Sequence, residues 1–311
     1  MLASLIKING YSPFKALMLR EYWENRRAIF MTPLVITAIT MALVIISMGI
    51  FGRAIHINGE SYTLGEVIAE MSSRKTGELS DHINHLLLFS SIPVMIGVWF
   101  CMVFTALGSL YDERKDNSIL FWKSMPVSDF QTILSKILTV TLVIPMVAIG
   151  FTLVFQVFLL IIGSFYTIGT EYSAWDLMWS STNLPLLVLN EMIYMIMYSL
   201  WALPIFAWFF LASVIAKRTP LLVATIPVAL IALFEGLFFH SDYLVRFIGM
   251  RISGAHIMGS EHGYAQNFTK LDPMSTLEIL QSAASPAFWM GLAVAAALLT
   301  ATILLRRRNS L

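Results

Sequence analysis

The 311-residue chain is 58% hydrophobic and 13% charged, with a mean hydropathy of +0.76 and a net charge of +1. This composition excludes an ordinary soluble domain, because a chain of this size could not hide so many apolar side chains from water. The net charge by itself indicates no partner, and we expect no nucleic-acid partner. The chain is therefore predicted to lie in a bilayer.

Six apolar stretches are long enough to cross the hydrocarbon core of a bilayer, which takes about 20 residues of helix. The predicted fold is an all-α integral membrane protein with six transmembrane helices in one domain, residues 1–311. The predicted spans are 29–51, 85–111, 137–163, 184–215, 221–239 and 287–305. No cleaved signal peptide is expected, because Lys7 and Lys15 precede an amphipathic run and then a full-length span.

The distribution of basic residues predicts the orientation. Most of the 20 Lys and Arg residues fall in the N-terminal segment, the loop after the second span, the turn after the fourth span and the C-terminal tail. Loops rich in Lys and Arg stay in the cytoplasm. Both termini and the loop 112–136 are therefore predicted to be cytoplasmic.

An interfacial helix is predicted within residues 1–28. Ser12 can cap a helix that has Pro13 at its first position. Behind them the apolar residues recur with helical spacing, while Arg20, Glu24 and Arg27 form a polar stripe. The alternative is an ordinary cytosolic helix. The apolar positions are Phe14, Leu17, Met18 and Tyr22.

The fourth predicted span and the outer loops are less regular. A helix over 184–215 would be about 48 Å long, well beyond the hydrocarbon thickness, so it must tilt, kink or protrude, and Pro204 supplies a kink. A short helix is expected around 64–71 in the first outer loop. The segment 240–286 is predicted to form a small outer cap or to dip back into the membrane.

The chain carries no motif for chemistry of its own. It has no P-loop to hold ATP, no His-Glu-x-x-His and no Gly-x-Ser-x-Gly, so we do not expect an enzyme. His82 and His85 have a spacing that suits two metal ligands, but nothing nearby completes a tetrahedral site, and no metal is predicted. Cofactors are expected to be absent from this chain.

Two carboxylates fall within the predicted spans, Glu191 and Glu235. An ionisable group in a membrane is costly unless it is paired or wetted, so each is a candidate functional residue. They are predicted to line a translocation pathway together with Asn190. The alternative is that they reach the interface or bond to a neighbouring helix.

The loop between the second and third spans contains a short amphipathic helix, predicted over 118–125. Ile119, Phe121, Trp122 and Met125 fall on one side of it, and Pro126 ends it. Ser128 can then cap the helix that leads into the third span. A helix this short needs a partner surface to be stable.

This arrangement resembles the membrane subunits of type-2 ABC exporters. The resemblance rests on Glu113-Arg114-Lys115, Ser118-Ile119-Leu120, the run from Ser124 to Ser128, and Lys136, together with the six spans and the interfacial helix. Two positions depart from the family pattern, Asn117 before the short helix and Ser135 before the lysine.

The resemblance implies a permease that pairs with a second copy or a related permease and with separate ABC ATPase subunits, which hold ATP and Mg²⁺. The short helix would then be a coupling helix seated in the ATPase. The ATPase-docking residues would be Glu113, Ser118, Ile119, Phe121, Trp122 and Met125. The rival functions are a proton-coupled secondary transporter and a membrane-embedded enzyme, each using Glu191 or Glu235.

No wide polar lining is evident in the predicted spans, so a hydrophobic or amphipathic substrate is expected rather than a sugar or an ion. Homodimer and heterodimer remain open alternatives. The location predicted is a cell membrane, and uncleaved insertion with only one cysteine favours a bacterial inner membrane.

Overall fold

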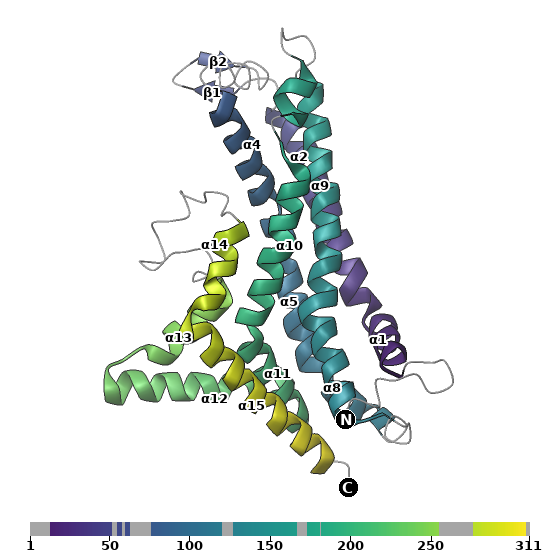
Figure 1. Cartoon of the computed structure of the whole chain (residues 1–311), viewed down its shortest axis with the longest axis vertical. Coiled ribbons are helices and arrows are strands. Elements are labelled where there is room, and N and C mark those ends of the chain that lie inside the picture. The colour runs from purple at the N-terminus through teal and green to yellow at the C-terminus, as the bar shows by residue number, and fades with distance from the viewer. Residues whose placement is uncertain are drawn as a thin grey trace.

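A computed structural model describes residues 13–51, 55–57, 60–62, 76–119, 127–166, 173–180, 182–254 and 276–308. Figure 1 shows an elongated bundle of helices, in agreement with the predicted helical fold. The helices are α1 (Pro13–Glu24), α2 (Thr32–Phe51), α4 (Thr76–Ser90), α5 (Ile92–Gly108), α6 (Tyr111–Lys115), α8 (Asp129–Leu138), α9 (Ile144–Tyr166), α10 (Leu184–Trp201), α11 (Leu203–Ile215), α12 (Pro220–Phe234), α13 (Tyr243–Ser253), α14 (Thr276–Gln281) and α15 (Pro286–Arg308).

Several short elements join these helices. One feature was not predicted, a small antiparallel hairpin of β1 (Ile55–Ile57) and β2 (Glu60–Tyr62), in which Ile57 pairs with Glu60. The helix predicted around 64–71 lies outside the described residues. The remaining elements are π-helical turns at Arg27–Met31, Thr139–Val143, Trp175–Trp179 and Glu235–Phe239, and a 3-10 turn at Ser282–Ala284.

Six helical segments in the described part of the chain are long and apolar enough to cross a membrane, which confirms a multi-pass membrane architecture. The fourth differs from its predicted extent. It ends at Trp201, and after Ala202 a separate shorter helix, α11, begins with Pro204 in its first turn. Proline lacks the N–H that would continue the helix, so the break falls where Pro204 predicts it. The six segments are Arg27–Met48, Ile83–Lys115, Asp129–Phe165, Leu184–Trp201, Pro220–Phe239 and Pro286–Arg308.

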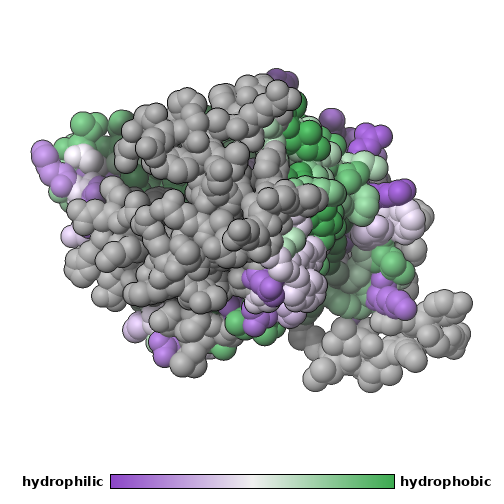
Figure 2. Space-filling model, turned by 90° about the horizontal axis from the view of Figure 1, so that it is seen from above, coloured by the Kyte–Doolittle hydropathy of each residue, from purple (hydrophilic) through white to green (hydrophobic). Residues whose placement is uncertain are grey.

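The apolar residues divide between an interior and an outer surface. The main buried cluster is built from α5, α8, α9, α10, α11 and α15, with Phe206, Phe210 and Ile144 among its fully buried side chains. Many other large apolar side chains stay exposed, for example Ile39, Phe104 and Val154. Hydrophobic residues are also visible on the flanks in Figure 2. An apolar exterior of this kind suits contact with lipid.

Helix α12 differs from the rest of the bundle in its direction and in the exposure of its side chains. In Figure 1 it runs across the direction of α9 and α10 and lies beside α13. Ala224 is its only buried side chain, while Leu230, Ile231 and Leu233 are exposed. The fifth predicted span therefore exists as an apolar helix that contacts α11, where Trp208 donates to the Ala224 carbonyl, and leaves most of its apolar side chains exposed.

The end of the molecule at the bottom of Figure 1 collects three segments that the charge distribution assigns to one side. Helix α1, the region after α5, and the C-terminal end of α15 meet there. The predicted N-terminal helix is thus present as α1, and its position at the membrane interface stays a prediction. Within the predicted outer segment 240–286, helices α13 and α14 are described, while 255–275 lies outside the described residues.

Candidate functional site

A buried cluster of charged side chains lies where α1, α6, α8 and α15 meet. We call Arg20, Glu21, Glu113, Lys136 and Arg306 the charge cluster. Glu113 is at its centre: one carboxylate oxygen is 2.6 Å from Arg20 and 3.2 Å from Lys136, and the other is 3.1 Å from Arg306. Glu113 is only 5% exposed, so these ion pairs are shielded from water.

Two more carboxylates, Glu21 within the charge cluster and Asp129 beside it, pair with its basic side chains. Glu21 of α1 lies 3.0 Å from the Lys136 amine, and Asp129 lies 3.1 Å from Arg306. Burial raises the pKa of the Glu21 carboxyl, although the Lys136 ammonium acts in the opposite direction. Charges taken out of water this far are stable only when they are paired and hydrogen-bonded, and the carboxylates supply those partners.

A second set of contacts fixes the region after α5 to the end of α11. The backbone N–H groups of Leu110 and Tyr111 donate to the Ser213 hydroxyl, at 3.1 and 2.9 Å. The Arg114 guanidinium donates to the backbone carbonyls of Ser213 and Ala216. Arg114 thereby satisfies carbonyls that the helix end leaves without a partner in the helix.

The predicted coupling helix begins beside the charge cluster. Asn117 has a φ of 56°, a left-handed conformation that Asn tolerates better than most residues, and it turns the chain after α6. Ser118 and Ile119 follow as partly buried residues, and the Ser118 hydroxyl donates to the Glu113 carbonyl at 3.3 Å. Residues 120–126 lie outside the described residues, and with them Phe121, Trp122 and Met125.

The next described residues include the N-terminal cap of α8. The Ser128 hydroxyl accepts from the Gln131 backbone N–H, and the Gln131 side chain accepts from the Ser128 N–H, both at 3.2 Å. This reciprocal pair is a capping box and confirms the predicted Ser128 cap. Along the chain, residues 120–126 are thus preceded by the ion-paired Glu113 and followed by the capped start of α8.

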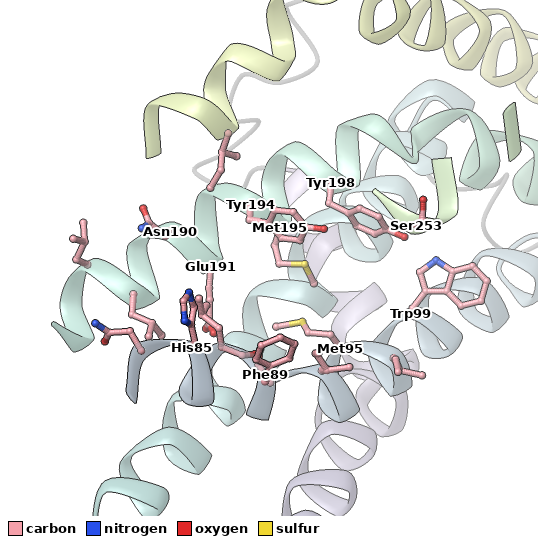
Figure 3. A pocket seen from close by; sticks show the side chains of 18 of the residues that line it. His85, Phe89, Met95, Trp99, Asn190, Glu191, Tyr194, Met195, Tyr198 and Ser253 are labelled. Atoms are coloured by element: carbon pink, nitrogen blue, oxygen red, sulfur yellow. The ribbon is translucent and has the colours of Figure 1, made fainter. Parts of the chain in front are cut away.

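A cavity of about 910 Å³ lies between α4, α5 and α10, with the end of α13 beside it. Figure 3 shows Met195, Tyr194 and Tyr198 on α10 opposite Phe89, Met95 and Trp99 from α4 and α5. The two tyrosine rings stack at 6.2 Å. The wall is therefore mostly apolar, with Phe, Trp, Tyr and Met side chains beside Leu and Ile, a lining that can adapt to apolar ligands.

Polar groups in the cavity wall gather around Glu191. Its carboxylate accepts hydrogen bonds from the Gln156 amide at 2.7 Å and from the Thr152 hydroxyl at 3.3 Å, both on α9. Asn190 and His85 also line the cavity. The His85 Nε2 atom is buried and has no hydrogen-bond partner among the described residues. None of the described residues that line the cavity is Lys or Arg.

The two intramembrane carboxylates, for which the same role is predicted from the sequence, have different surroundings in the structure. Asn190 and Glu191 line the cavity, but Glu235 is not among its lining residues. The Glu235 carboxylate instead accepts from the Tyr243 and Leu244 backbone N–H groups, at 2.7 and 3.0 Å, and from the Ser241 hydroxyl. Glu235 therefore caps the first turn of α13, where free N–H groups favour an anion.

Sequence reasoning missed several residues of both sites. Glu21 looked like an ordinary helix residue, and its role depends on Lys136, far away in the chain. Thr152 and Gln156 were missed as partners of Glu191, although a Gln within an apolar span is itself a signal. In the described part of the chain, no group of three or more potential ligands could hold a metal ion.

Comparison with protein-family models, with curated proteins and with solved structures finds no match for this chain.

Proposed function

We propose that this chain is the permease subunit of an ATP-driven exporter of the ABC-2 type, with ATP bound and hydrolysed by a separate ATPase chain. The observation that carries the proposal is the charge cluster, which ties the base of the loop 112–136 to α1, α8 and α15. A loop that transmits motion from a partner protein to the spans must be held rigidly against those spans. Its partners would be ABC ATPases and a second copy of this permease or a related permease.

The proposed mechanism is mechanical coupling. Closure of an ATPase pair would move the helix predicted over 118–125, and the motion would pass through Glu113 and the capped start of α8 into the second, third and sixth spans. Those spans would then shift between two packed arrangements that open the cavity to opposite sides. The aromatic and Met-rich wall favours a hydrophobic or amphipathic substrate.

Replacing Trp122 with Ala is expected to weaken ATPase docking, because a large apolar side chain would be lost from the contact. The full chain would be purified from its native membrane, the bound Walker-motif ATPase quantified and its ATP hydrolysis measured. We expect recovery of the ATPase to fall at least tenfold for Trp122→Ala, and similarly for Phe121→Ala.

The matched control is Trp175→Ala. Trp175 is 65% exposed and belongs to the turn between α9 and α10, so its loss should leave ATPase recovery unchanged. Equal recovery for Trp122→Ala and Trp175→Ala would contradict the proposal. So would transport that needs no ATP and follows a proton gradient. That result would favour a proton-coupled transporter using Glu191, which the buried carboxylate in the cavity makes the second candidate.

A further inference from the structure

We infer that the cavity binds lipophilic organic cations, with Glu191 as the counter-charge. The inference deepens the proposed function, since it names a substrate class for the cavity that the exporter would use. It rests on three features of the cavity: a carboxylate without a Lys or Arg partner among the described residues of the wall, aromatic faces, and a volume suited to a small organic molecule.

The first feature is the buried carboxyl group of Glu191. The side chain is 6% exposed, and its hydrogen-bond donors Gln156 and Thr152 are both neutral. The charge cluster shows how this same chain treats its other deeply buried carboxylates: Glu21 and Glu113 each lie within 3.2 Å of a basic side chain. Among the described residues that line the cavity, none is Lys or Arg, and His85, which also lines it, forms no ion pair with Glu191. A cationic ligand would supply the missing opposite charge.

The second feature is the aromatic wall. Trp99, Tyr194 and Tyr198 all line the cavity, and the face of an aromatic ring attracts a cation most strongly where water is excluded. A carboxylate and aromatic faces in one cavity together favour a positive ligand over a neutral or negative one. An anion of similar size to such a cation would instead meet the carboxyl oxygens of Glu191 and the negative ring faces.

The third feature is the shape and flexibility of the cavity. Its volume of about 910 Å³ falls in the range of sites for drug-sized ligands. Met95 and Met195 face each other across it in Figure 3, and unbranched thioether side chains can rearrange around ligands of different outline. The lipophilic part of a cation would contact these residues while its charge faces Glu191.

The test uses a pair of probes that share their shape and differ in charge, tetraphenylphosphonium and tetraphenylborate. The full chain would be placed in phosphatidylcholine nanodiscs, and the binding of each probe measured separately by equilibrium dialysis against empty nanodiscs. We expect saturable binding of tetraphenylphosphonium above the empty discs and none of tetraphenylborate. Equal binding of the two probes, or no saturable binding of the cation, would overturn the inference.

Two variants locate the site. Glu191→Gln should weaken tetraphenylphosphonium binding at least tenfold, while Glu24→Gln, which removes an exposed carboxylate of α1, should leave it unchanged. If Glu191→Gln does not fold, Trp99→Leu should still weaken cation binding several-fold with the carboxylate intact. Unchanged binding in a folded variant at either cavity position would place the cation elsewhere and overturn the inference.

The outcome is separable from the proposed exporter function. Retained ATPase recovery together with absent cation binding would reject the substrate class and leave the permease proposal standing. Cation binding without any ATPase partner would reject the exporter and keep the cavity as a cation site.

Discussion

Glu113→Ala is expected to destabilise the protein more than any other single substitution considered for this chain. The change removes the carboxylate that Arg20, Lys136 and Arg306 share, and so leaves an excess of buried positive charge. Removing one partner of a buried ion pair costs about 3–5 kcal/mol. The melting temperature of the purified protein should therefore fall by several degrees or more.

The chain carries its own reporter for this measurement. Cys101 is the only cysteine in the sequence, is 8% exposed, and donates to the Ala28 carbonyl at 3.0 Å. A maleimide dye that fluoresces on reaction with a thiol would detect its exposure during a thermal ramp in detergent. Glu113→Ala should react at lower temperature than the unchanged protein.

Control variants test whether the loss of stability comes from the missing Glu113 charge and not from the loss of its side-chain atoms. Glu24→Gln removes only the solvent-exposed partner of Arg20 and leaves the Arg20–Glu113 pair intact, so it should shift the melting temperature little, since pairs open to solvent contribute about 0–1 kcal/mol. The double substitution Glu113→Gln with Lys136→Met removes one charge of each sign, and should recover part of the loss seen in Glu113→Gln alone. A melting temperature for Glu113→Ala equal to that of Glu24→Gln would refute this account of the cluster.

Arg251→Ala is expected to release α13 from the bundle. The buried Arg251 guanidinium donates to the Trp201 carbonyl at 2.7 Å and to the Ala287 carbonyl at 2.5 Å. Its Cζ atom also lies 3.9 Å from the centre of the Trp201 ring. Burial lowers the pKa of Arg251 to about 10, which still leaves it charged at pH 7.

Arg251 thus joins three helices at the point where α10 is interrupted. Hydrogen bonds from a charged donor contribute about 1.5–3 kcal/mol each, so Arg251→Ala should cost about 3 kcal/mol or more. Arg251→Lys should rescue little, because one ammonium lacks the planar fork that reaches both carbonyls. The dye-based melting experiment measures both variants.

The same helix offers a matched control for Arg251→Ala. Arg246 lies on α13 as well, but its side chain is 56% exposed and forms an ion pair with nearby Asp242, which is also exposed. Arg246→Ala should therefore leave the melting temperature nearly unchanged. Gly291→Ala provides an independent check, since a Cβ there would collide with the Arg251 guanidinium and should lower stability without touching Arg251 itself. Equal melting of the Arg246 and Arg251 variants would contradict the anchoring role.

Local signals in the sequence predicted local structure well. The Ser128 cap and the break at Pro204 were both predicted, because a cap depends on residues three positions apart and a proline acts on its own helix. The hairpin of β1 and β2 was missed, because its strands are only three residues long and too short to show a clear alternation.

The two carboxylates Glu191 and Glu235 mark the limit of sequence reasoning for the candidate site. Both stand near the outer ends of apolar stretches, so depth alone could not distinguish them. They differ in their neighbours on other elements. Thr152 and Gln156 of α9 donate hydrogen bonds to Glu191, whereas the first backbone N–H groups of α13 donate to Glu235. Nothing in the spacing along the chain specifies those neighbours.

The sequence by itself determined that the chain is helical and crosses a membrane several times, because the cost of exposing apolar side chains to water depends on composition and length alone. Only the tertiary structure decided that Glu113 joins Arg20 and Arg306, which stand 93 and 193 positions away in the chain. It also decided that Glu191 faces a cavity. Both results depend on how the helices pack, and packing brings together side chains that no local pattern connects.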